Sequence, residues 1–417
     1  MKINGQVEIA VIGGGASGLA AAIAAADERE RRGLSAGSIL VIEKNQEAGR
    51  KLLATGNGRC NFSNRLCSWR DFHGSHPGFA RVVLDKFSPE YVVSFFEEHG
   101  LWIREEEQGR LYPVTGQAVS LRNILMQSCE ERGVEFLFGE TVKEVVFNGA
   151  SFTLTMESGE EIRVRKLIIA TGGRAGMQYG SDGDGYGFAK AFGHTLVAPK
   201  PALAAMTSYD IEELKGVRTR ARVSLLRKGE VKAQSQGEVQ FGANLLSGIC
   251  CFDVSRFVER DAAEAGEYTL RLDLFPDFSP EDLQEKIMNL CANLGPRPAS
   301  HLLVGLLPEK LAEYCLQRWG MDGSRLAGSL MSMEIKSLCM LLNNLDFPVT
   351  GTRGWKEAQV SAGGVDTSQV NPLTLESNIQ QGVYFAGEVL DVDGPCGGYN
   401  LQWAWASGFA AGMAAAR

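Results

Sequence analysis

The strongest constraint on the fold is the stretch "VEIAVIGGGASGL", residues 7 to 19, where a short apolar run leads into closely spaced glycines. Gly13, Gly15 and Gly18 fit the pattern G-x-G-x-x-G, between a predicted strand and an alanine-rich predicted helix. In such a loop the first glycine permits a tight turn, the second lets a pyrophosphate approach, and the third allows close helix–strand packing. The pattern predicts a Rossmann-like dinucleotide-binding domain. The alternative is a glycine-rich loop without a ligand.

An acidic residue closes the next predicted strand. "SILVIEK", residues 38 to 44, completes a β-α-β unit and carries Glu43 near its end. A carboxylate at this place accepts hydrogen bonds from an adenosine ribose and disfavours a 2'-phosphate, so NAD or FAD is preferred to NADP at this site. The alternative is a strand-end glutamate in a surface ion pair.

The loop after Glu43 favours FAD over NAD. "NQEAGRKLLATGNGRCNFSN", residues 45 to 64, stands where a domain that binds only NAD would continue with a helix and a parallel strand. Positive charge or helix N-termini beside the flavin N1 and C2 carbonyl would stabilise the anionic reduced flavin. The alternative is a solvated basic loop. The cations, amides and glycines suited to a pyrophosphate and an isoalloxazine ring are Gly49, Arg50, Lys51, Gly56, Asn57, Gly58, Arg59 and Asn61.

A second glycine cluster, in "GVYFAGEVLDVDGPCGGYN" at 382 to 400, also precedes a predicted helix. Its strand delivers Gly387 and Glu388, and Gly398 opens the helix with free N–H groups. We expect the two clusters to hold opposite ends of one FAD, which places both ends of the chain in one domain. The strand "LIIATGG", 167 to 173, is expected to reach the cofactor from the far side of the sheet. Asp391 and Asp393 either bind ribityl hydroxyls or cap loop N–H groups.

The chain of 417 residues is long enough for two or three domains. Predicted helices between 77 and 133 precede a β-meander, and two prolines near residue 200 suggest a boundary. We therefore predict an α/β fold with a discontinuous Rossmann-like FAD-binding domain, made of a mostly parallel sheet plus a β-meander, and an inserted α+β domain. The expected parts are 1–196 and 346–417 for the FAD-binding domain and 197–345 for the insert on the substrate side.

Composition narrows the classes of function. No apolar run approaches the ~20 residues that span a bilayer, and the first residues lack the features of a signal peptide, so we expect a cytoplasmic protein. A net charge of −8 argues against a nucleic-acid partner. The nine cysteines include no CxxC pair and the five histidines lack metal-ligand spacing, so neither a disulfide framework nor a metal is predicted. Cys60 is interpreted as a buried structural thiol in preference to a redox or nucleophilic one.

Five segments together resemble a known family: "IGGGASGL", "GRKLLATGNGRCNFSN", "SDGDGYGFAKAFGHTL", "SAGGVDT" and "YFAGEVLDVDGPCGGYNLQWAWASG". They are similar to the bacterial FAD-binding oxidoreductases that include aminoacetone oxidase and the clostridial 3-dehydro-bile-acid reductase, over about residues 7 to 415. The resemblance implies FAD contacts at Gly13, Gly15, Ser17, Glu43, Lys51, Thr171, Gly387, Asn400 and Leu401. Together, the patterns and the resemblance give as candidate cofactor ligands Gly13, Gly15, Ala16, Ser17, Glu43, Lys44, Arg50, Lys51, Asn57, Gly58, Val142, Thr171, Gly172, Gly387, Glu388, Asp393, Gly398, Asn400 and Leu401, with no metal ligand and no assigned catalytic residue.

Two loops depart from the family. "RAGMQYG" at 174 to 180 and "FGANLLSGI" at 241 to 249 replace the family's "SYP" and "FTHFGLSGP" segments, so no member's substrate transfers directly. The leading expectation is hydride transfer through noncovalent FAD, in an NAD(P)H-dependent reductase of an unsaturated, steroid- or bile-acid-like small molecule. NAD(P)H would be a transient donor, because no second dinucleotide motif is present. The alternatives are an oxygen-using oxidase of a small amine such as aminoacetone, and a flavin-binding sensor without turnover. Candidate proton donors are Tyr112, Tyr179 and Tyr399, and the oligomeric state is left open.

Overall fold

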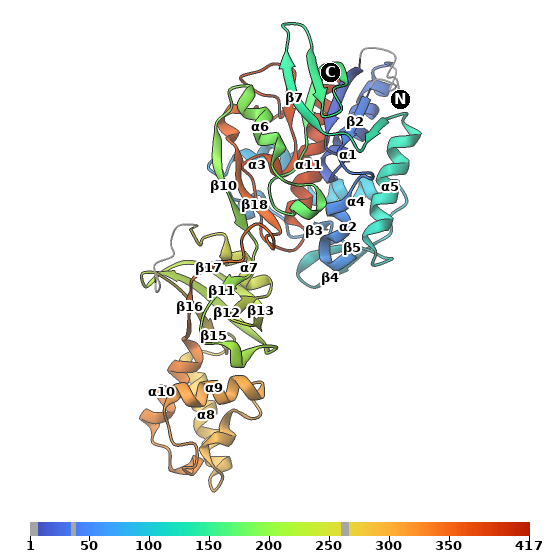
Figure 1. The fold of residues 1–417 in the computed structure, drawn as a ribbon. Helices are drawn as coiled ribbons and strands as arrows, with labels where there is room; N and C mark the ends of the chain where they lie inside the picture. The colour runs from blue at the N-terminus through green and yellow to red at the C-terminus, as the bar shows by residue number, and fades with distance from the viewer. Residues whose placement is uncertain (1–6, 35–38, 260–266) are drawn as a thin grey trace. The chain divides into compact units, whose positions relative to one another are not determined.

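The computed structural model describes residues 7–34, 39–259 and 267–417. Residues 1–6, on which part of the signal-peptide expectation rests, lie outside this range. The chain forms two compact units (Figure 1). Unit 1 combines Met1–Pro201 with Gln359–Arg417, and unit 2 is Ala202–Ala358.

The centre of unit 1 is a mostly parallel sheet. Its parallel strands lie in the order β6-β2-β1-β9-β19, and an antiparallel meander of β7 and β8 continues from β9. The central strands are mostly apolar and almost fully buried: β1 reads VEIAVI and β2 reads ILVIE, as expected for parallel strands covered on both faces. The expected α/β class is confirmed. These strands are β1 (Val7–Ile12), β2 (Ile39–Glu43), β6 (Glu135–Phe138), β7 (Val142–Phe147), β8 (Phe152–Met156), β9 (Glu161–Ile169) and β19 (Val383–Phe385).

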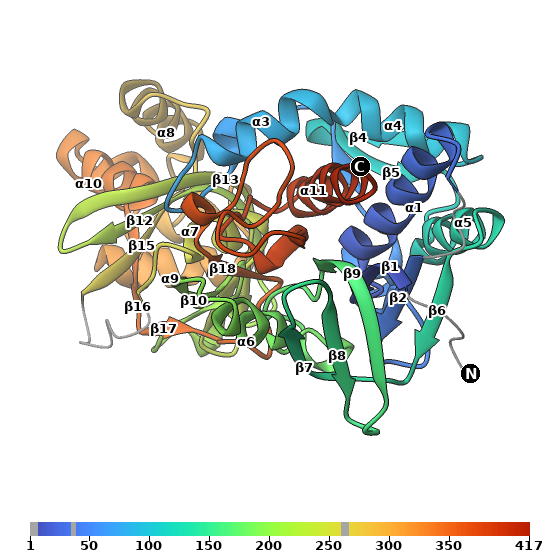
Figure 2. The same cartoon turned by 90° about the horizontal axis from the view of Figure 1, so that it is seen from above.

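Two helices from opposite ends of the chain pack together beside this sheet. They are α1 (Ala16–Arg31) and α11 (Tyr399–Ala415), which lie side by side in Figures 1 and 2. A Cβ atom at Gly408 would lie 2.5 Å from the Ser17 carbonyl oxygen, and one at Gly412 would overlap the carbonyl of Ala21. The helix backbones therefore touch without intervening side chains.

The same contacts fix the relative direction of the two helices. Gly408 faces Ser17 and Gly412 faces Ala21, so both helices run the same way. At 1.5 Å per residue, the N-terminus of α11 begins roughly two turns, ~12 Å, before that of α1 along this direction. The two helix N-termini thus point toward the same region at staggered depths.

The remaining elements of unit 1 surround this pair. Trp403 and Trp405 of α11 are buried, and their indole N–H groups donate to the main-chain oxygens of Gly387 and Phe62. They serve in packing. The other elements are α2 (Arg50–Ala54), α3 (Phe79–Lys86), α4 (Pro89–Glu98), α5 (Ala118–Glu131), α6 (Asp184–Ala191), a small sheet of β3 (Ser63–Asn64), β4 (Ile103–Glu106) and β5 (Arg110–Pro113), and the pair β10 (Leu196–Ala202) and β18 (Val360–Val365).

Unit 2 is an antiparallel sheet with helices, in the strand order β16-β15-β12-β13-β14-β11-β17. The expected insert ended at 345, whereas unit 2 extends from 202 to 358. The difference arises because β16 and β17, which follow residue 344, pair with strands of this sheet. The elements are β11 (Met206–Thr207), β12 (Arg218–Arg227), β13 (Glu230–Gly242), β14 (Leu245–Ser247), α7 (Ile249–Ser255), β15 (Tyr268–Asp273), α8 (Pro280–Leu294), α9 (Glu309–Trp319), α10 (Ser332–Asn343), β16 (Leu345–Val349) and β17 (Gly351–Thr352).

The α1–α11 contact generates a prediction. Gly412→Ala should destabilise unit 1 by about 1–3 kcal/mol, because the added methyl group must push two backbones apart. The matched control is Gly187→Ala in α6, where an added Cβ meets nothing within 4 Å. This control should leave stability unchanged or raise it by up to ~1 kcal/mol through helix propensity. Urea denaturation followed by circular dichroism measures both; equal stability of the two variants would contradict the packing described.

Candidate functional site

Three strand ends meet at the N-terminus of α1. Gly13 follows β1 with a φ of 104°, and a Cβ there would lie 2.5 Å from the carbonyl oxygen of Ala170, after β9. Gly387 follows β19 with a φ of 80°, and its Cβ would lie 2.5 Å from Oγ of Ser17. Only glycine combines this left-handed backbone with such close neighbours. The chain thereby brings four sequence-predicted positions together: Gly13, Ser17, Thr171 and Gly387.

Both helices that face this region begin without a side-chain cap. The N-cap residues are Gly15 for α1 and Gly398 for α11, and neither first turn contains an acidic residue. A Cβ at Gly15 would meet nothing within 4 Å, so space for a ligand adjoins the free N–H groups. Helix N-termini of this kind bind phosphate and other oxygen anions. The two ends therefore fit a FAD whose pyrophosphate lies at α1 and whose flavin carbonyl lies at α11.

Glu43 is buried at the end of β2 and holds neighbouring backbone. One carboxylate oxygen accepts from the main-chain N–H of Gly14 at 2.8 Å. The other accepts from the main-chain N–H of Asn45 at 2.8 Å and from its side-chain amide at 2.6 Å. A carboxylate offers about four acceptor positions, so roughly one is left for a ribose hydroxyl. Glu43 can thus shape the glycine loop and bind a ribose at the same time.

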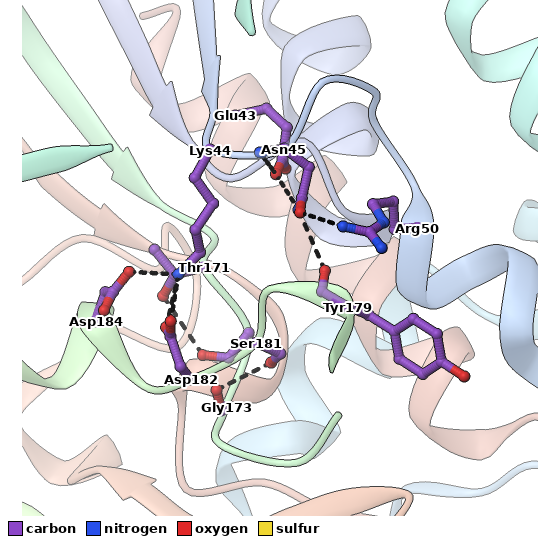
Figure 3. A network of polar contacts seen from close by, with 11 residues as sticks. Glu43, Lys44, Asn45, Arg50, Thr171, Gly173, Tyr179, Ser181, Asp182 and Asp184 are labelled. Atoms are coloured by element: carbon purple, nitrogen blue, oxygen red, sulfur yellow. Dashed lines mark hydrogen bonds and ion pairs between the residues drawn. The ribbon is translucent and has the colours of Figure 1, made fainter. Parts of the chain in front are cut away.

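Lys44 gathers two aspartates that the sequence analysis did not select. Its ammonium group lies 2.7 Å from Asp182 and 2.6 Å from Asp184, across a separation of about 140 residues (Figure 3). Burial opposes ionisation of Asp182, but the hydrogen bond and charge of Lys44 outweigh it and lower its pKa. At Asp184 burial dominates and the pKa is raised. The "SDGDG" stretch was part of the family resemblance, but its pairing with Lys44 depends on the tertiary fold.

The departing loop, residues 174 to 180, is tied to the same end of the site. The side-chain amide of Asn45 donates to the Tyr179 carbonyl at 3.2 Å, and Arg50 donates to the Asn45 side-chain oxygen at 2.7 Å. In Figure 3 the Tyr179 ring extends away from Lys44 and the two aspartates. Other polar contacts of this loop run to Lys51, a predicted cofactor residue, and to the Ser361 hydroxyl.

The cations of the basic loop all have protein partners. Lys51 lies 2.6 Å from Glu388 and also donates to the Ala175 carbonyl, while Arg59 pairs with Glu106. Glu388 in turn accepts from the main-chain N–H of Ser361 at 2.8 Å. The acidic partners of Lys51 and Arg59 neutralise two of the three positive charges that the sequence suggested for a reduced flavin, whereas Arg50 donates to the neutral side chain of Asn45. The N-terminus of α11 has no side-chain cap and no acidic residue in its first turn, so its positive end, like the charge of Arg50, is not neutralised by these contacts.

The polar groups of the segment before α11 bond mainly to other protein groups. Asp391 accepts from the main-chain N–H of Ser75 at 2.7 Å, and the main chain of Asp393 pairs with that of His73. The side-chain amide of Asn400 bonds Gly394 in both directions, at 2.9 and 2.8 Å. For Asp391 the structure therefore favours capping of a loop. Asn400 and Leu401 keep their main-chain N–H groups, in the first turn of α11, for a ligand.

The loop from 55 to 61 has a strained backbone. Gly56, Asn57, Gly58 and Cys60 all have positive φ, and for the two non-glycine residues this conformation costs energy. Strain of this kind recurs at ligand sites. Cys60 is buried, and burial raises the pKa of its thiol to about 12. A neutral thiol fits the expected structural role rather than a nucleophilic one.

The other predicted residues lie nearby or at the edge of this arrangement. Ala16 begins α1, and Gly172, with a φ of 74°, faces the Ser181 hydroxyl. Val142 opens β7 four residues after Phe138, which pairs with Glu43 in the sheet. Among proton-donor candidates, the Tyr112 ring lies beneath the Arg59 guanidinium, 4.3 Å from its Cζ, and Tyr399 begins α11.

Two searches of residues 7–34, 39–259 and 267–417 gave negative results. No group of three or more His, Cys, Asp and Glu side chains in these ranges could hold a metal ion. None of their helices combines the length and apolar character needed to cross a membrane.

Comparison with known proteins gives full-length matches. The family model described as "HI0933-like protein Rossmann domain" matches residues 7–414. The chain is 36% identical over 410 residues to the 3-dehydro-bile acid delta(4,6)-reductase of Clostridium scindens, covering 98% of each. It is 30% identical over 402 residues to the ribosomal RNA dihydrouridine synthase of Escherichia coli, covering 96% of each. A structure of 3-ketosteroid delta1-dehydrogenase from Sterolibacterium denitrificans shares the fold, with 13% identity, 99% coverage of each chain and a TM-score of 0.53.

The burial of Cys60 yields a prediction. In the folded protein at about pH 8, iodoacetamide should leave Cys60 unmodified, because a thiol with a strongly raised pKa holds almost no thiolate. Peptide mass spectrometry after brief labelling measures this, with urea-unfolded protein as the positive control. The half-exposed Cys396 serves as an internal reference for labelling of the folded state. Modification of Cys60 as fast as in urea would restore the nucleophile interpretation.

Proposed function

The chain belongs to the HI0933-like Rossmann family and is an oxidoreductase, and we propose that it uses noncovalent FAD and NAD(P)H to saturate a carbon–carbon double bond conjugated to a carbonyl. The observation that carries the FAD assignment is the pair of uncapped, staggered N-termini of α1 and α11. Their offset of about 12 Å suits one ligand with a phosphate group and a carbonyl group joined by a ribityl chain.

Three parts of the proposed cofactor would each contact a different set of residues. The Gly13–Gly15 loop and the first turn of α1 would bind the pyrophosphate, and Glu43 the adenosine ribose. The N-terminus of α11, opened by Gly398, would stabilise negative charge that develops at the flavin N1 and C2 carbonyl. The Lys51–Glu388 pair lies between, where its half-buried charges can fix neighbouring backbone.

The reaction balances as a transfer of two electrons. When bound, FAD would take a hydride from NAD(P)H and deliver one to the β carbon of the unsaturated carbonyl compound. A proton adds at the α carbon, so the double bond becomes a single bond and NAD(P)H becomes NAD(P)+. The chain's part is to hold the ring, to exclude water and to supply that proton, for which Tyr112 and Tyr399 are candidates near the glycine loops.

The names of both relatives support reduction of a conjugated double bond. One is a delta(4,6)-reductase of a 3-dehydro-bile acid, and the other makes dihydrouridine, in which the uracil double bond is saturated. We favour a small enone because identity to the bile-acid enzyme is higher and because the net charge of −8 opposes RNA phosphates. Uridine in ribosomal RNA is the second candidate, since that relative also matches over 96% of the chain.

The cofactor site predicts an effect at Gly15. Gly15→Ala should weaken FAD binding at least tenfold, because its methyl group would occupy the space proposed for the pyrophosphate. The apoprotein should keep its stability, since the backbone is extended there and an added Cβ meets no protein atom. Titration of apoprotein with FAD, followed by flavin fluorescence, measures affinity, with Gly187→Ala as the control. Unchanged affinity in Gly15→Ala would contradict this placement.

One experiment tests the proposed reaction. FAD-loaded protein is mixed anaerobically with NADH or NADPH, and the oxidised-flavin absorbance is followed by stopped flow. Rapid bleaching by a nicotinamide, then reoxidation by a Δ4-3-keto steroid or bile acid with one equivalent of saturated product, is the expected result.

Separate arms distinguish the alternatives. Reoxidation only by ribosomal RNA lacking dihydrouridine, with mass increase at uridine, would replace the enone by RNA. Bleaching by aminoacetone, with peroxide on admission of air, would make the protein an oxidase. No bleaching by any donor, in protein that binds FAD, would favour the sensor.

A further inference from the structure

Asn61 has a buried acceptor without a partner. Its side-chain oxygen Oδ1 is inaccessible to solvent and makes no hydrogen bond to any described residue. A buried polar atom left unpaired costs about 1–3 kcal/mol. Such an atom beside a ligand region indicates that the ligand supplies the missing donor.

Asn61 lies between the strained loop at 55 to 61 and the second glycine cluster. Asn61 ends the strained loop, and its main-chain nitrogen lies 3.2 Å from where a Cβ of Gly56 would be. On the other side, a Cβ at Gly398 would lie 2.9 Å from Asn61 Oδ1 and would overlap the carbonyl of Ser63. The unpaired oxygen therefore lies directly beside the N-cap of α11. An acceptor and a set of free N–H donors thus adjoin one another within unit 1.

We propose that Asn61 Oδ1 accepts a hydrogen bond from N3–H of the flavin ring, and so positions the isoalloxazine. The inference rests on the proposed FAD site. In the flavin ring, N3 is bonded directly to the C2 carbonyl carbon. The N–H groups at the start of α11 would therefore face the C2 carbonyl oxygen, and the adjacent Asn61 Oδ1 would face N3–H. N3–H is present in both oxidised and reduced flavin, so this contact persists through turnover. Asn61 is a positioning residue in this scheme.

A double-mutant cycle between protein and cofactor tests the contact. Apoprotein is titrated with FAD and with 3-methyl-FAD, which lacks the N3–H donor. In the unaltered protein, 3-methyl-FAD should bind at least tenfold more weakly than FAD. Asn61→Ala should bind FAD about threefold to tenfold more weakly, as for loss of one hydrogen bond, and should no longer distinguish the two cofactors.

Two further variants serve as controls for the double-mutant cycle. Asn61→Asp retains an acceptor of the same shape, so it should still discriminate against 3-methyl-FAD. Asn123→Ala, exposed on α5 and hydrogen-bonded to Arg122 alone among the described residues, should behave like the unaltered protein. The Asn61→Ala apoprotein should melt at the same temperature or higher, because an unpaired buried oxygen has been removed. A residue needed for folding would instead lower it.

The outcomes separate this inference from the proposed function. If the unaltered protein binds neither cofactor, the FAD assignment itself fails. If it binds FAD but Asn61→Ala discriminates against 3-methyl-FAD as strongly as the unaltered protein, FAD stands and the contact to N3–H is overturned. Equal affinity of the unaltered protein for both cofactors would also overturn it.

Discussion

The contact between α1 and α11 determines most of what unit 1 can do. Gly408 and Gly412 let the two backbones meet at Ser17 and Ala21, and side chains at these positions would hold the helices apart. Because the contact sets both direction and stagger, it also sets the distance between two uncapped N-termini. Gly387 is held in the same assembly, since Trp403 and Ser407 of α11 bond its carbonyl and its N–H. The contact that packs α1 against α11 therefore also sets the spacing of the two helix ends proposed to bind the ligand.

Electrostatics at this site depends on dipoles more than on side-chain charges. Lys51 and Arg59 each have an acidic partner, and Lys44 is shared by Asp182 and Asp184, whereas Arg50 donates to the neutral side chain of Asn45. A paired cation offers a weaker field to a developing anion than a free one. Helix N-termini supply about half a positive charge without a counter-ion. The arrangement would hold the cofactor firmly while leaving charge stabilisation to the backbone.

Local patterns predicted the fold well because its determinants are local: apolar runs, glycine spacing and the strand–loop–helix order around Gly13. They also selected Glu43 and Gly398, which lie beside such signals and stay predictions as cofactor ligands. They could not predict that Lys44 meets Asp182 and Asp184, or that Lys51 meets Glu388, because these pairs join segments about 140 to 340 residues apart. The sequence could not predict the unpaired oxygen of Asn61 either, because its burial and its lack of a hydrogen-bond donor depend on the tertiary structure. The predicted end of the insert, residue 345, came too early because the sequence of β16 does not indicate that it pairs with β15.

The order in which the chain is made has a consequence for α1. The ribosome completes this alanine-rich helix early, but α11, which covers its Ser17–Ala21 face, follows roughly 370 residues later, or about 20–80 s at ordinary rates of synthesis. Unit 2 is finished in the interval and can fold as a separate body. The nascent first half of unit 1 must meanwhile wait with an uncovered apolar helix, a natural substrate for chaperones. The proposed FAD site would therefore be complete only after α11 has been made.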